Sequence, residues 1–142
     1  VFMGDASAEE DYVLGALGWA STKKLPILFI VEDNNLSILT EKKVRRNWHM
    51  HKVAQSFNMK GFNISDNPLE IKKYEKYFFK EPMLLNINTK RLFWHAGAGI
   101  DSDKTFDRFK SIKKLLGVKA VKENIKNFNQ IANLWEKIYE KL

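Results

Sequence analysis

The sequence predicts an α/β protein with three layers, α/β/α, around a mostly parallel sheet. Short apolar runs that end in polar turns alternate with stretches of helical periodicity, a pattern typical of parallel sheets with crossover helices. The apolar run from 27 to 31 is nearly continuous, as in strands that are buried on both faces. We expect strands at 1–4, 27–31, 61–65 and 83–88.

The first two strands and the helix between them predict a βαβ unit. Ser7 and Glu10 have the spacing of a capping box, with Ser7 as N-cap of a helix from Ser7 to Lys24. Apolar residues recur along this helix at helical spacing. Gly15 and Gly18 lower its intrinsic stability, and we expect these small residues to let the helix lie close to the sheet.

Polar residues follow both strands of this unit. A parallel βαβ unit with its right-handed crossover places Asp5 and Asn34 side by side at the carboxyl ends of the strands. Open α/β sheets bind their ligands at this edge. A carboxylate and an amide oxygen beside a helix N-terminus suit a hard cation that bridges to a phosphate. The sequence therefore predicts a magnesium–diphosphate site.

The rest of the chain divides at residue 101. Residues 36–47 lack a clear period and are expected to form a loop, whereas helices are expected at 48–58 and 69–80. A glycine-bearing loop spans 92–101, and two helices follow at about 104–116 and 120–142. We therefore expect a diphosphate-binding α/β domain at 1–101, and at 102–142 helices that pack on that domain or on a partner subunit.

Composition excludes several classes of protein. The 142 residues include no cysteine, so disulfides and thiolate metal sites are impossible. No run of about 18 apolar residues and no signal-peptide pattern occurs, so we expect no membrane contact and a location in the cytoplasm, or in the mitochondrial matrix in a eukaryote. The net charge of +7 is spread along the chain without an RNA-binding signature. We expect no nucleic-acid partner, and interpret Arg45 and Arg46 as part of a solvated basic loop.

Several short motifs together resemble a known family. Gly4-Asp5-Ala6 and Glu32-Asp33-Asn34 stand about 30 positions apart around a Lys24-Leu25-Pro26 entry into an apolar strand. This pattern resembles the thiamine diphosphate motif, which begins with Gly-Asp-Gly and closes on Asn-Asn. Within that group the chain looks most like the C-terminal portion of the alpha subunit of 2-oxo acid dehydrogenases. The resemblance implies the thiamine diphosphate-binding fold, without its N-terminal part.

The resemblance also implies a set of ligands. Asp5, Asn34 and the backbone carbonyl of Leu36 would bind Mg²⁺, which takes one or two carboxylates together with phosphate oxygens. Gly4, Ala6 and Ser7 would complete the diphosphate site. Ala6 departs from Gly-Asp-Gly, and its methyl group narrows the approach of backbone N–H groups to the diphosphate.

His95 is the candidate for proton chemistry. It resembles the histidine of the family's His-Ser loop, which borders the cofactor, and the usual pKa range of histidine suits proton transfer. The sequence 96–99, Ala-Gly-Ala-Gly, replaces the serine-rich stretch that is phosphorylated in some relatives. We therefore predict no such phosphorylation here.

The function implied by the resemblance is the oxidative decarboxylation of a small 2-oxo acid with thiamine diphosphate and Mg²⁺. The pyrimidine-binding domain would come from a beta-type subunit in a heterotetramer, and a lipoyl-bearing acyltransferase would accept the acyl group. This chain alone would then be inactive. Two alternatives stay open: another thiamine diphosphate-dependent decarboxylase or carboligase, and a truncated, non-catalytic subunit domain.

Overall fold

A computed structural model describes residues 1–92, 95 and 106–141 of the chain. It divides into two compact units, Val1–Thr105 and Phe106–Leu142. The first unit contains the sheet and every predicted site residue, and the second is helical.

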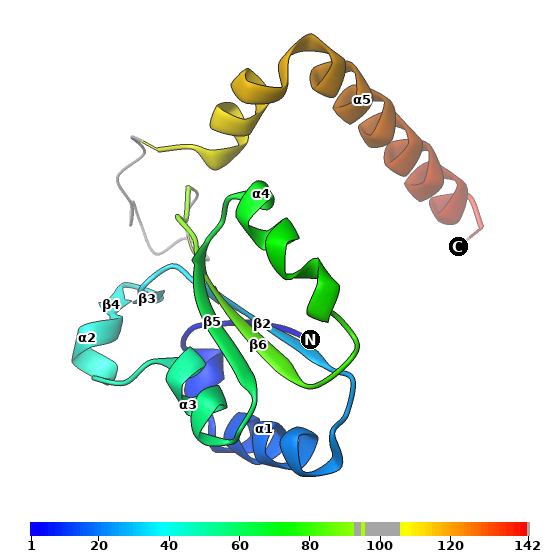
Figure 1. The fold of residues 1–142 in the computed structure, drawn as a ribbon. Coiled ribbons are helices and arrows are strands. Elements are labelled where there is room, and N and C mark those ends of the chain that lie inside the picture. Colours follow the sequence, from blue (N-terminus) through cyan, green and yellow to red (C-terminus); the bar gives the residue numbers. More distant parts are fainter. Residues whose placement is uncertain (93–94, 96–105, 142) are drawn as a thin grey trace. The chain divides into compact units, whose positions relative to one another are not determined.

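The first unit is built on a four-stranded sheet (Figure 1). The order is β1-β2-β6-β5, and all three pairings are parallel. The bounds are β1 Phe2–Gly4, β2 Leu28–Asp33, β5 Lys60–Ser65 and β6 Met83–Asn88. The parallel α/β fold predicted from the sequence is confirmed, and the four strands lie where the apolar runs placed them.

Helices cover both faces of this sheet and make the three layers. On one face, α1 (Asp11–Lys23) and α3 (Met50–Ser56) bury a core that includes Leu17, Val31 and Leu84. On the other, α4 (Pro68–Ile71) and the 3₁₀ helix η2 (Lys72–Tyr77) cover the second core, which includes Met83 and Leu85. The segment 69–80, predicted as a single helix, is therefore divided: it begins in α4, half of it is 3₁₀, and residues 78–80 lie beyond both helices.

The capping box predicted at the start of α1 is also wrong. Ser7–Glu9 forms a separate 3₁₀ turn, η1, in which the Glu10 N–H donates to the Ser7 backbone carbonyl at 3.3 Å. Glu10 is then extended and stands at the N-cap of α1, without a side-chain capping bond. In a capping box the Glu10 N–H would donate to the Ser7 side chain. Here that N–H is bonded within the 3₁₀ turn instead.

Gly15 does not bring α1 close to the sheet as predicted. It is exposed, and a Cβ built on it meets no atom within 4 Å among the described residues. Gly15→Ala should therefore raise the free energy of unfolding by about 1 kcal/mol, because alanine costs less backbone entropy in a helix. Urea unfolding followed by circular dichroism measures this change; a loss of stability would show that the glycine has a packing role.

The segment 36–47, predicted as a loop, is structured. β3 (Leu36–Ser37) and β4 (Thr40–Glu41) pair as an antiparallel hairpin, and the short helix α2 (Lys42–Arg45) follows. No side-chain capping bond begins α2. Ion pairs from its side chains to carboxylates outside the helix hold it in place instead.

The second unit consists of α5 (Arg108–Tyr139), broken at Gly117. Gly117 has φ 71° and ψ −165°, so it separates two helical stretches. The break lies between the two predicted helices, while the start expected near residue 104 lies outside the described residues. Within the part of the chain that the structure describes, no helix is long and apolar enough to cross a membrane.

Candidate functional site

A small cavity of about 250 Å³ lies at the carboxyl edge of the sheet. All the residues predicted to bind the cofactor or metal line it: Gly4, Asp5, Ala6, Ser7, Asn34, Leu36 and His95. Its remaining lining residues are Ser37, Ile38 and Arg91. The structure thus brings every predicted site residue to one place, from three separate parts of the chain.

The parallel register explains this convergence. Gly4 of β1 pairs with Glu32 of β2, so Asp5 and Asn34 leave neighbouring strands at the same edge. β6 ends at Asn88, whose partner on β2 is Asp33. The chain after β6 therefore brings Arg91 and His95 to the same cavity.

Two side-chain turns shape the stretch after β2. The Asp33 carboxylate accepts a hydrogen bond from the Asn35 N–H at 3.0 Å, and the Asn34 amide oxygen accepts one from the Leu36 N–H at 2.9 Å. Asn35 takes the left-handed conformation, φ 68°, which asparagine tolerates. These turns fix the Asn34 side chain and the Leu36 backbone at the cavity wall.

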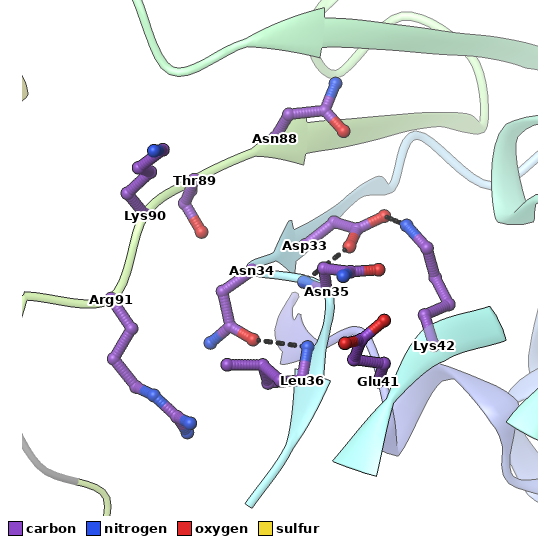
Figure 2. A pocket seen from close by; sticks show the side chains of 10 residues that line it. All are labelled: Asp33, Asn34, Asn35, Leu36, Glu41, Lys42, Asn88, Thr89, Lys90 and Arg91. Atoms are coloured by element: carbon purple, nitrogen blue, oxygen red, sulfur yellow. Dashed lines mark hydrogen bonds and ion pairs between the residues drawn. The ribbon is translucent and has the colours of Figure 1, made fainter. Parts of the chain in front are cut away.

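A larger cavity of about 540 Å³ adjoins the first (Figure 2). Asn34, Leu36 and Arg91 line both cavities. The guanidinium of Arg91 also donates to the backbone carbonyl of Ile38 in the hairpin, which ties the chain after β6 to the β3–β4 turn. Further lining residues of the larger cavity are Asn35, Glu41, Asn88, Thr89 and Lys90.

Asp5 is buried, with an exposed fraction of 1%. Its Oδ2 accepts a hydrogen bond from the Arg45 guanidinium at 2.6 Å. Burial raises the pKa of the Asp5 carboxyl, and the neighbouring Asp33 carboxylate adds to this, while the cations Arg45, Lys42 and Arg46 act in the opposite direction. Asp5 is therefore a carboxylate in a crowded, weakly solvated environment.

Arg45 and Arg46 are not a solvated basic loop, and that prediction is wrong. Arg45 also bonds Glu9 at 2.9 Å, and the Arg46 Nε lies 3.2 Å from the same carboxylate. The Arg46 side chain is 1% exposed, and its guanidinium lies 4.6 Å from the Trp48 ring centroid. Burial lowers the pKa of Arg46, partly offset by the acidic neighbours.

Lys42 extends the same group of charges to Asp33. The Asp33 carboxylate is buried and accepts hydrogen bonds from Lys42 and, at 3.0 Å, from the Asn86 amide. Burial alone would raise the pKa of Asp33, but the bonds from Lys42 and Asn86 and the Lys42 charge hold it below its usual value. We call Asp5, Glu9, Asp33, Lys42, Arg45 and Arg46 the α2 charge cluster.

The oxygens at the smaller cavity suit a hard cation that arrives with a phosphate. Within the described residues no group of three or more His, Cys, Asp or Glu side chains forms a metal site. The hydrogen bond from Arg45 goes to Asp5 Oδ2, and Asn34 and Leu36 offer neutral oxygens at the cavity. One carboxylate and two neutral oxygens leave several positions of an octahedral Mg²⁺ to phosphate or water.

The environment of the other predicted residues is open. Gly4, Ser7 and His95 are exposed, and a Cβ built on Gly4 meets no atom within 4 Å among the described residues. Ala6 has helical angles, φ −75° and ψ −41°, which its methyl group permits. Residues 93–94 and 96–101, the rest of the predicted His95 loop, lie outside the described residues.

Comparison with known proteins gives one consistent similarity. The chain is 29% identical over 105 residues to the pyruvate dehydrogenase E1 component subunit alpha of Rickettsia bellii, and 30% identical to that of Rickettsia prowazekii. These alignments cover 67% of this chain but only 32% of each relative, so the chain spans about a third of their length. No protein-family model matches. The similarity supports a relationship to dehydrogenase alpha subunits.

Proposed function

We propose that this chain holds the Mg²⁺ and diphosphate of thiamine diphosphate at the smaller cavity, as one half of a two-subunit active site. The observation that carries the proposal is the convergence of Asp5, Asn34, Leu36 and the turn after β1 on one cavity. Similarity to pyruvate dehydrogenase alpha subunits supports the same cofactor. The reaction we propose is the oxidative decarboxylation of a 2-oxo acid, in a cytoplasmic or mitochondrial-matrix enzyme.

In this proposal each side chain has a separate role. Asp5, Asn34 and the Leu36 carbonyl bind the metal, while the backbone at Gly4, Ala6 and Ser7 faces the diphosphate. The bound cofactor supplies the electron sink for loss of carbon dioxide. His95, which is exposed and lines the cavity, would hold or move a proton near that centre.

The partner completes the proposed enzyme. A beta-type subunit supplies the pyrimidine-binding domain in a heterotetramer, and a lipoyl-bearing acyltransferase takes the acyl group. Pyruvate is the first 2-oxo acid to test, because the similar Rickettsia proteins are named as pyruvate dehydrogenase subunits.

Calorimetry with thiamine diphosphate tests the proposed site. The titration uses the intact protein with its beta-type partner, once with Mg²⁺ and once with a chelator. Asp5→Asn should weaken the Mg²⁺-dependent binding by about 100-fold or more, roughly 2.7 kcal/mol, because an amide cannot replace the anionic metal ligand. Asp11→Asn, an exposed carboxylate at the start of α1, is the matched control and should bind as wild type.

The outcomes separate the competing functions. No binding by the wild-type assembly would contradict the cofactor site and leave a non-catalytic subunit domain. Binding with release of carbon dioxide and transfer to lipoamide supports the dehydrogenase. Binding with carboligation or aldehyde release supports another thiamine diphosphate-dependent enzyme instead.

A further inference from the structure

Arg45 forms an ion pair with Asp5, the carboxylate that we assign to the metal. Its guanidinium bonds Asp5 at 2.6 Å and Glu9 at 2.9 Å, and its side chain is only 14% exposed. Asp5 is 2% exposed in its side chain. A charge-assisted bond at this distance in a weakly solvated place is strong, so a cation that binds Asp5 must compete with Arg45.

The charges around this pair are already balanced. The α2 charge cluster contains three carboxylates, Asp5, Glu9 and Asp33, and three cations, Lys42, Arg45 and Arg46. They form four ion pairs, one between Lys42 and Asp33 and three between the two arginines and the carboxylates of Asp5 and Glu9. All three cations come from α2 and the residue after it. A bare divalent cation would add two uncompensated positive charges to this neutral and largely buried group.

A metal that arrives with a diphosphate meets a different balance. The diphosphate brings more negative charge than one divalent cation carries, so the pair adds no uncompensated positive charge to this neutral group. The cluster therefore opposes the metal–diphosphate pair less than it opposes the bare cation.

We propose that Arg45 is a counter-ion of Asp5 that withholds this carboxylate from a bare divalent cation, so that the metal binds only together with the diphosphate. This inference rests on the proposed function of the cavity. It assigns a positioning role to Arg45, which lines neither the smaller nor the larger cavity.

Mn²⁺ binding, followed by the electron paramagnetic resonance signal of the free ion, tests the proposal on the intact protein. Arg45→Met should raise the affinity for Mn²⁺ alone by about tenfold or more, because Asp5 then lacks its competing cation. Lys43→Met is the matched control. It removes the same charge from the same helix, but Lys43 is 79% exposed and pairs with Glu41, so its effect should stay below about twofold.

Two further variants keep the result decisive. Adding Asp5→Asn to Arg45→Met should abolish the gain, since the gained site depends on this carboxylate. Arg45→Lys covers the case in which the methionine variant does not fold. Lysine keeps one charge but lacks the planar fork that bridges two carboxylates, so a smaller gain, about threefold, is expected.

The outcomes distinguish this inference from the proposed function. Equal Mn²⁺ affinity in Arg45→Met and Lys43→Met, or a gain that persists without Asp5, overturns the counter-ion role. In that case Mn²⁺-dependent binding of thiamine diphosphate by the wild type, lost in Asp5→Asn, would leave the proposed function standing. Failure of the wild type to bind Mn²⁺ with thiamine diphosphate overturns both.

Discussion

Gly61→Ala should lower the free energy of unfolding by about 3 kcal/mol, the upper part of the range for overpacking a well-packed core. A Cβ on Gly61 would lie 2.1 Å from the backbone carbonyl oxygen of His51 in α3 and 3.2 Å from the Ala54 Cβ. The backbone oxygen cannot rotate away, so the whole of α3 must shift outward. That shift would open the core around Met50 and Ala54, which are both fully buried.

Urea unfolding, followed by circular dichroism, measures the effect. The midpoint of thermal unfolding should fall by about 10 °C or more if the first unit unfolds on its own. Gly15→Ala is the matched control, because the same change in open space should have the opposite sign. A Gly61→Ala protein as stable as wild type would mean that α3 does not pack on β5 as closely as described.

This contact illustrates what sequence patterns do not contain. The strand at 61–65 was predicted correctly, since its apolar residues and the turn after it are local signals. The need for glycine at position 61 comes from the approach of a helix whose contact residue is ten positions away. Such an approach depends on packing and has no signature in periodicity.

The candidate site also contains residues that local sequence signals identify and residues that only the fold brings together. Asp5 and Asn34 could be named from the sequence, because they follow strands whose parallel pairing is predictable, whereas Leu36 is implied only by the family resemblance. The roles assigned to them remain predictions. Arg45 and Glu9 were not recognised as neighbours of Asp5, since a four-residue helix shows no period and its partners lie 36 and 40 positions away.

One local signal could have indicated the cluster. The four basic residues of 42–46 are all paired with carboxylates, whereas only Arg45 and Arg46 are predicted from the sequence, as part of a solvated loop. These basic residues follow the two turns that carry the predicted ligands and precede the helix predicted at 48–58. That position would justify the expectation of an ionic contact. The choice of partner still requires the fold.

Lys42→Met should cost about 3 kcal/mol of unfolding free energy, because it leaves the buried Asp33 carboxylate without its cation. The Asn86 amide and the Asn35 N–H still bond Asp33, but neither carries a charge. Asp33→Asn in the same background should recover most of the loss, since neutralising both members of a buried pair costs far less than removing one. Denaturant unfolding of the two single variants and the double variant completes the cycle.

The pH dependence of this cost follows from the sign of the Asp33 pKa shift. The folded state holds the pKa of Asp33 below its usual value, so the folded state favours the ionised carboxylate. The resulting stability is present above the ordinary aspartate pKa, about 3.9, and is lost as the pH falls towards the lowered value. Lys42 is a main cause of that shift, so the cost of Lys42→Met should be full at pH 7 and much smaller near pH 3. A cost that is independent of pH would assign the effect to lost packing of the lysine side chain and not to the ion pair.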